Sequence, residues 1–209
     1  MEIQLLVEDW GYSYLVENGP NDQSFMGEAK FDATPGKTKI RGVFMQANVV
    51  NGNGRVYPKK ILEKAVDKYI KEQVKPCQAL GELNHPPRPN VDPAEAAIRI
   101  TDLWWEGDNV MGEAIVLNTP KGNIVKGLIE GGWVPGVSSR GLGSVKSING
   151  INEVQEGYRL TVGVDVVWGP SAPNAYVRAS VNESVEISNL KNGTDLAFMN
   201  LTKSLEKFL

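Results

Sequence analysis

The chain has 209 residues, a formal net charge of -3 at pH 7, 41% hydrophobic residues and 22% charged residues. These values are ordinary for a soluble globular protein, and the length suits one domain with appended terminal segments. Its lysines and arginines form no run that would give the positive surface of a nucleic-acid-binding protein, and no apolar stretch approaches the roughly 18 to 20 residues of a membrane span. We therefore expect a folded protein that binds neither nucleic acid nor membrane.

The chain contains one cysteine, Cys77, and one histidine, His85. A single cysteine excludes an intramolecular disulfide and a cysteine-rich zinc site, and it suits a reducing compartment such as the cytoplasm. With one histidine and scattered carboxylates there is no spacing typical of metal ligands. The sequence therefore predicts neither a metal nor a cofactor.

The apolar periodicity divides the chain into three parts. Residues 1–37 mix short apolar runs with turn-forming residues, which predicts a loosely structured segment, and residues 181–209 read as a polar linker followed by a helix. Between them, residues 38–180 form the predicted domain. Its predicted strands lie at about 39–50, 78–83, 96–105, 110–117, 133–139, 143–148 and 158–168, and its predicted helices at about 58–74 and 121–130. Many strands with few helices, in no strict alternation, predict an α+β fold built on a largely antiparallel sheet or barrel.

His85 is the first candidate for chemistry. It follows a short predicted strand and precedes two prolines, in Asn84-His85-Pro86-Pro87, so its backbone is held extended at the mouth of a loop. An imidazole is the usual general base near neutral pH because its unperturbed pKa is about 6.5. A lone histidine is more often structural, but the stiffened turn favours a catalytic role for this one.

A serine nucleophile is best sought at 137–143, Val-Ser-Ser-Arg-Gly-Leu-Gly. Glycines there allow a tight backbone whose amides can hold an oxyanion, and Arg140 adds a positive group. Side chains alternate along a strand, so only one of Ser138 and Ser139 can face the site. A serine- and glycine-rich turn without chemistry is the competing interpretation.

A carboxylate would orient the imidazole and stabilise its cation. Asp165 is the leading candidate, because it is acidic within an otherwise apolar strand and a buried carboxylate needs a partner. A structural pairing of Asp165 with an arginine, or the use of Asp92 or Asp102 in its place, remains an equal alternative.

These residues stand in stretches that closely resemble the prohead core proteases of T-even-type bacteriophages. The matching stretches run from about residue 40 to about residue 175 and include 42–47 (GVFMQA), 57–59 (YPK), 81–87 (GELNHPP), 136–143 (GVSSRGLG), 160–165 (LTVGVD) and 168–173 (WGPSAP). The family is similar to herpesvirus assemblins and other head-maturation proteases, which share a serine protease fold, a β-barrel surrounded by helices.

The resemblance implies catalytic residues in the order His85, Ser139 and Asp165. Relatives have the nucleophile in a Ser-x-Gly context, which Ser139 satisfies and Ser138 does not. Assemblins have a second histidine as third member, and Asp165 is its replacement here. The amides near Arg140 and Gly141 are expected to hold the oxyanion and substrate.

The resemblance also implies the biological role. Such enzymes are packaged inside the prohead in the host cytoplasm and cut scaffold, internal core and major capsid proteins, and then themselves, after Glu in a Leu/Ile-x-Glu context. This context occurs several times here, among others at Glu8, Glu17, Glu82 and Glu130. Self-processing is expected at Glu8 or Glu17, Arg140 or Arg88 could bind the substrate Glu, and a homo-oligomer is left open. The alternative function is a non-enzymatic capsid or tail protein, because fold does not fix function.

Overall fold

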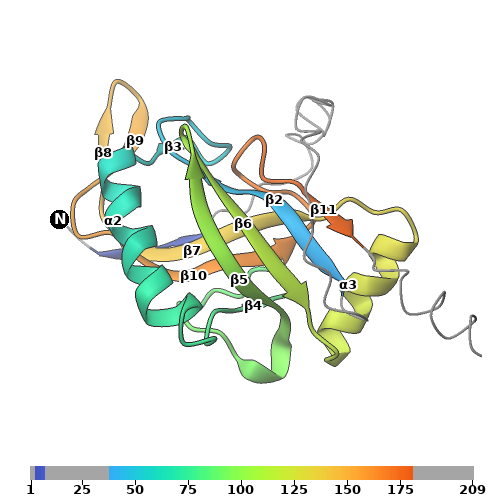
Figure 1. The fold of residues 1–209 in the computed structure, drawn as a ribbon. Helices are drawn as coiled ribbons and strands as arrows, with labels where there is room; N and C mark the ends of the chain where they lie inside the picture. Colours follow the sequence, from blue (N-terminus) through green and yellow to red (C-terminus); the bar gives the residue numbers. More distant parts are fainter. Residues whose placement is uncertain (1–2, 8–37, 181–209) are drawn as a thin grey trace, which may run out of the picture.

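The structure is a computed structural model that describes residues 3–7 and 38–180 (Figure 1). Its strands are β1 (Gln4–Val7), β2 (Lys39–Gln46), β3 (Arg55–Val56), β4 (Leu80–Glu82), β5 (Ala96–Glu106), β6 (Asn109–Val116), β7 (Gly136–Gly143), β8 (Val145–Ile148), β9 (Ile151–Val154), β10 (Arg159–Val167) and β11 (Val177–Ser180). Its helices are α2 (Lys59–Tyr69), which continues as the π-helical turn η2 (Ile70–Val74), the 3-10 turn η3 (Pro93–Glu95), and α3 (Pro120–Glu130). None of the helices in these residues is both long and apolar enough to cross a bilayer.

The strands form three sheets with the orders β1-β7-β10, β11-β2-β6-β5-β4 and β3-β9-β8. The first two sheets are joined at two places. At one seam Leu83 bridges Val166 in parallel, and at the other Gly136 bridges Tyr176 in antiparallel fashion. The larger strands therefore follow one another around a common apolar core, with α2 and α3 at opposite ends of the assembly (Figure 1). The prediction of an α+β, largely antiparallel fold is confirmed.

The central elements lie close to their predicted positions, and three differences have physical causes. Residues 4–7 were assigned by sequence to the loosely structured segment, which is wrong, because β1 pairs with β7 and its Leu6 is fully buried. The strands expected at 133–139 and 143–148 become a long β7 and a short β8, because Gly141 and Gly143 remain extended inside the ladder. The short strands β3, β9 and β11 were not predicted. The linker and helix expected over 181–209 lie outside the described residues.

Helix α2 covers the end of the core next to β10. Its buried residues are Leu62, Ala65, Val66 and Tyr69, the three- and four-residue spacing that brings side chains onto one helical face. Burial raises the pKa of Tyr69 from its ordinary value of 10.0 to about 12, opposed by a hydrogen bond with the backbone of Gly163 and aided by the charge of Asp165. The phenol is therefore held in its neutral form at the buried end of the helix.

Gly81 lets β4 lie against both of its neighbours. On one edge it pairs with Ile98 of β5, and a Cβ added at this glycine would lie 2.1 Å from the backbone oxygen of Val164 in β10 and 2.9 Å from a side-chain carbon of Ile98. Since a backbone atom cannot turn aside as a flexible side chain can, any larger residue must move β4 away from β10. His85 follows β4 by three residues, so this close contact also determines where the histidine lies.

We expect Gly81→Ala to lower the free energy of unfolding by about 2 kcal/mol or more, because overpacking a tight contact forces backbone shifts. Urea unfolding monitored by tryptophan fluorescence measures the change. Gly127→Ala is the matched control, since Gly127 lies inside α3 with no atom within 4 Å of its added Cβ. The control should be neutral or stabilising by up to about 1 kcal/mol. Equal effects of the two substitutions would contradict this account of the seam.

Tyr69 predicts a pH dependence of stability in alkali. The phenol ionises near pH 10 in the unfolded chain but near 12 in the folded one, so its contribution is complete below pH 10 and is lost as the pH rises from 10 to 12. Across that window Tyr69→Phe should make the free energy of unfolding less dependent on pH than in the wild type, by a total of the order of 2 kcal/mol. Urea titrations at several pH values measure both slopes, and parallel curves would contradict the assignment.

Candidate active site

The polar site lies at the seam between β4 and β10. After β4, the backbone N–H of Asn84 donates to the oxygen of Val166 at 2.8 Å, which extends the pairing of the two strands beyond the sheet proper. Asn84 has a positive φ of 71°, a conformation that asparagine tolerates better than most residues, and Pro86 and Pro87 follow His85. The chain thus turns immediately around the histidine, which is held against β10.

His85 and Asp165 are brought together by this turn. Nδ1 of His85 lies 2.7 Å from Oδ2 of Asp165, and the two side chains are 1% and 0% exposed. The Nε2 atom of the imidazole is buried and has no hydrogen-bond partner among the described residues. Because the carboxylate contacts Nδ1, it favours the tautomer with its proton on that nitrogen, which leaves Nε2 as a free base.

The carboxylate of Asp165 has two further hydrogen-bond donors and one further ion-pair contact. The backbone N–H of Glu82 donates to Oδ1 at 2.7 Å. The guanidinium of Arg140 donates from Nη2 to Oδ1 at 3.0 Å, and its Nε lies 2.6 Å from Oδ2. The sequence suggested either an imidazole or an arginine as the partner of Asp165. In the structure both groups contact this one buried carboxylate.

Arg140 differs from its prediction as a positive group facing the substrate. Its side chain is fully buried, and in addition to Asp165 it donates from Nη1 to the backbone oxygens of Arg88 and Asn90 at 2.8 and 3.3 Å. Glu82 Oε2 lies 3.6 Å from Nη2. The guanidinium is therefore committed to partners inside the protein, because a buried cation needs acceptors and negative charge around it.

The backbone at Arg140 and Gly141 also differs from an open oxyanion site. Arg140 is paired with Val7 on one side and Val162 on the other, and Gly141 lies between Leu6 and Leu160. In an interior strand the backbone N–H groups face neighbouring strands. Gly141 has a different role as well, since a Cβ there would lie 2.4 Å from the Tyr158 ring. Its glycine permits the ring to pack onto β7.

The two candidate serines lie on opposite faces of β7. Ser138 is the register partner of Asp165, whereas the neighbouring pair is Val137 with Val166, two valines of the hydrophobic core. Ser139 is two residues from Val137 and so shares its face. The register therefore places Ser138 on the face that carries the carboxylate and Ser139 on the face toward the core.

The hydroxyl environments agree with this assignment. Ser138 is 3% exposed, and its Oγ, like Nε2 of His85, is buried without a hydrogen-bond partner in the described part of the chain. Buried polar atoms without a hydrogen-bond partner are rare in proteins overall. Those that occur often lie at sites where a reacting group or a substrate supplies the missing hydrogen bond. The register and the unpaired Oγ thus distinguish Ser138, on the face of β7 that carries Asp165, from Ser139.

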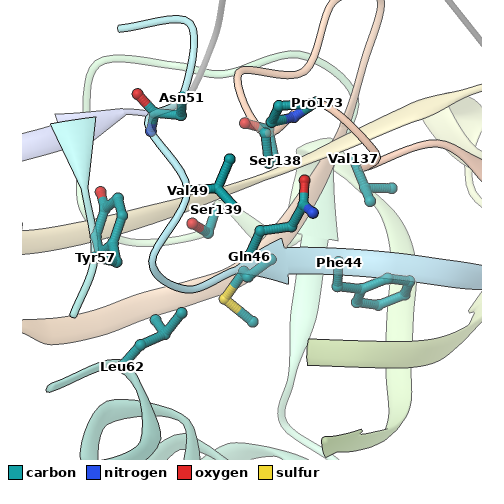
Figure 2. A pocket seen from close by; sticks show the side chains of 12 residues that line it. Phe44, Gln46, Val49, Asn51, Tyr57, Leu62, Val137, Ser138, Ser139 and Pro173 are labelled. Atoms are coloured by element: carbon teal, nitrogen blue, oxygen red, sulfur yellow. The ribbon is translucent and has the colours of Figure 1, made fainter. Parts of the chain in front are cut away.

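A pocket opens beside both serines (Figure 2). Most of its lining side chains are apolar, and the polar ones include Gln46 and Asn51. The lining residues are Phe44, Met45, Gln46, Val49, Asn51, Tyr57, Leu62, Val137, Ser138, Ser139, Ala172 and Pro173. The loop that carries Asn51 is fastened to the loop after β10 by the hydrogen bond from Gly52 N to the oxygen of Ser171, at 2.9 Å.

The alternative carboxylates are engaged locally. Asp92 caps the turn η3 through Ala94 N, and Asp102 accepts a hydrogen bond from Leu103 N. Neither makes a hydrogen bond or ion pair with His85, whose contact is with Asp165. Among the described residues, no group of three or more histidine, cysteine or acidic side chains could hold a metal ion.

Glu82 is the member of this site that sequence considerations missed. Its side chain is 2% exposed, and Oε1 accepts from Nη2 of Arg88 at 2.7 Å and from the backbone N–H of Asp92. An acidic residue directly after the apolar run Ala79-Leu80-Gly81 was a usable signal, the same one that selected Asp165. It was missed because a short strand does not reveal which of its faces is buried.

Both the sequence and the fold of this chain match those of known proteins. The family of prohead core protein serine proteases matches residues 5–186. The prohead core protein protease of Enterobacteria phage T4 is 49% identical over 212 residues, which cover 100% of this chain and 99% of the relative. The solved structure of the bacteriophage T4 capsid assembly protease, gp21, matches with a TM-score of 0.69 and 49% identity, and covers 81% of this chain and 100% of that chain.

The matched region contains every residue of the site described above, and the overall arrangement of strands agrees with that of the solved protease. The alternative of a non-enzymatic barrel is therefore set aside, and the chain is an enzyme that hydrolyses peptide bonds. It belongs to the family of prohead core protein serine proteases.

Proposed function

We propose that this protein is the endopeptidase that cleaves the scaffold, internal core and major capsid proteins of a phage prohead during maturation. Family membership supports the peptidase activity, and the T4 relative, whose solved structure is called a capsid assembly protease, supports the prohead as the place of action. The catalytic residues are Ser138 as nucleophile, His85 as general base and Asp165 as the carboxylate that orients it.

One observation carries this proposal. The only imidazole in a 209-residue chain contacts a fully buried carboxylate at 2.7 Å, while its other nitrogen remains without a partner among the described residues. A merely structural histidine at this depth would be expected to use both nitrogens, because an unpaired buried polar atom costs about 1 to 3 kcal/mol. A protein that keeps this loss of stability typically has a reactive site there, in which a reacting partner supplies the missing hydrogen bond.

The reaction follows from this arrangement. As the hydroxyl oxygen of Ser138 attacks the substrate carbonyl, Nε2 of His85 takes its proton, and Asp165 holds the ring and stabilises the imidazolium that forms. The same proton then passes to the leaving amine, and water releases the acyl group from the serine. Ser139, preferred on its Ser-x-Gly context, is the second candidate nucleophile, since it also lines the pocket.

We propose that cleavage follows Glu in a Leu/Ile-x-Glu context. Recognition of a carboxylate needs a cation, and the two arginines considered for it differ in the structure. The Arg140 side chain is fully buried, whereas Arg88 exposes 39% of its side chain next to the active site while pairing with Glu82. Arg88 is therefore the stronger candidate for binding the substrate glutamate.

Self-cleavage belongs to the same proposal, and burial or a helical backbone argues against two of its candidate sites. Glu82 is 1% exposed within β4, and Glu130 ends helix α3, whereas a protease needs an accessible, extended chain. Leu6 and Val7 end the described N-terminal strand, and Glu8 and Glu17 lie outside the described residues. Processing at Glu8 or Glu17 therefore remains the expectation.

We expect Ser138→Ala to lower kcat on a Leu-x-Glu peptide by about a thousandfold or more, because loss of the nucleophile leaves only binding and electrostatic catalysis. His85→Ala should have a similar effect. Ser139→Ala should stay within about tenfold of wild type, and Ser147→Ala, which removes an exposed hydroxyl on β8, controls for serine removal itself. Loss of activity in Ser139→Ala but not in Ser138→Ala would return the nucleophile to Ser139.

Incubation of active enzyme should give new N-termini after Glu8 or Glu17, which intact-mass spectrometry detects. Ser138→Ala protein should keep its original N-terminus, and Glu8→Gln combined with Glu17→Gln should prevent the processing while leaving peptide hydrolysis unchanged. An active wild-type enzyme with an unprocessed N-terminus would remove self-cleavage at these sites from the proposal.

A further inference from the structure

The His85–Asp165 pair is embedded in a cluster of charges from three separate segments. Glu82 ends β4, Arg140 comes from β7, and Arg88 from the loop that follows His85. Each guanidinium contacts a carboxylate: Arg140 contacts Asp165 at 2.6 and 3.0 Å, and Arg88 contacts Glu82 at 2.7 Å. Two negative and two positive side chains therefore surround the imidazole.

Arg140 connects the carboxylate to the loop that carries the histidine. Its Nε and Nη2 contact Asp165, while Nη1 donates to the backbone oxygens of Arg88 and Asn90, three and five residues after His85. A guanidinium is planar and rigid, so these contacts fix the position of Asp165 relative to the loop. A lysine could supply the charge but not the same set of directions.

The charge of Arg140 also acts on the imidazole. A carboxylate beside a histidine favours the protonated ring, and a cation on the same carboxylate weakens that preference. Asp165 and Arg140 are both 0% exposed, so solvent screens these interactions little. The groups facing His85 and Asp165 from the surrounding elements are Arg140 on β7, Glu82 on β4, Arg88 on the following loop and Tyr69 on α2.

We infer that Arg140 is a positioning residue for the catalytic pair, and that its balance with Glu82 sets the pH range in which His85 is a neutral base. This inference rests on the proposed role of His85 as general base and assigns the arginine a function other than substrate binding. Arg140 holds Asp165 in place and keeps it from drawing a proton onto the imidazole. Glu82, whose Oε2 lies 3.6 Å from Nη2, offsets part of the positive charge of Arg140.

The two charged residues should have opposite effects. Arg140→Met removes the cation and leaves Asp165 uncompensated, so the imidazole should hold its proton to higher pH. Glu82→Gln keeps the shape and an acceptor oxygen for Arg88 but removes the negative charge, so the ring should lose its proton at lower pH. The pH at the midpoint of the His85 titration is expected to change by about 0.5 or more in each direction.

Because His85 is the only histidine in the chain, its ring protons give a unique signal in an NMR pH titration of untagged full-length protein. We expect the titration midpoint to rise in Arg140→Met, to fall in Glu82→Gln and to stay unchanged in Lys146→Met, which removes an exposed charge on β8. Arg140→Lys should keep the wild-type midpoint but lower kcat about tenfold or more with little change in KM, because the charge remains and the geometry is lost.

Midpoints that move in the same direction, or Glu82→Gln with the wild-type midpoint, would overturn the inference. If Arg140→Met fails to fold, Glu82→Gln and Arg140→Lys decide it, since the first changes only charge and the second only geometry. The NMR readout needs no activity, so it is separate from the proposed function. Retained activity in His85→Ala would refute the proposed function while the titration still tested the charge balance.

Discussion

The active site depends on the ionised carboxylate of Asp165 being held inside the protein. Moving a carboxylate out of water is strongly unfavourable unless charges and donors replace its hydration. Here an imidazole, a backbone N–H and a guanidinium contact it, from the segment after β4, from β4 itself and from β7. These contacts explain why three segments converge on this point of β10, and why removing one partner would affect the others.

The closing of the sheets brings these partners into reach. His85 is 80 positions from Asp165 and Arg140 is 25, so only the pairing of β4 and β7 along the two edges of β10 joins them. Gly81 makes the first approach close enough, since no side chain separates β4 from the backbone of β10. The polar site thus lies at a seam where two sheets meet. The backbone pairing is interrupted there, and hydrogen bonds of side chains take its place.

The choice between the serines follows from strand alternation. A shift of the register by one residue would exchange the faces of Ser138 and Ser139, and the valine pair beside them prevents such a shift because it belongs to the core. The same alternation carries Arg140 to the face of Asp165. The proposed nucleophile and the proposed positioning residue are therefore two residues apart on one strand, and the hydrophobic core fixes the register of both.

The sequence by itself determined the elements with strong local periodicity and the chemistry that needed a partner. The apolar spacing on α2 and the alternation along β10 led to an α+β fold. The single imidazole and the acidic residue in an apolar strand made Asp165 the leading partner of His85, with other pairings left open. The tertiary structure alone decided the pairing of β1 with β7, the face of each serine, and the burial of Arg140 and Glu82. Short strands and side-chain direction depend on which distant segment pairs with which, and that is set by long-range packing that local sequence does not encode.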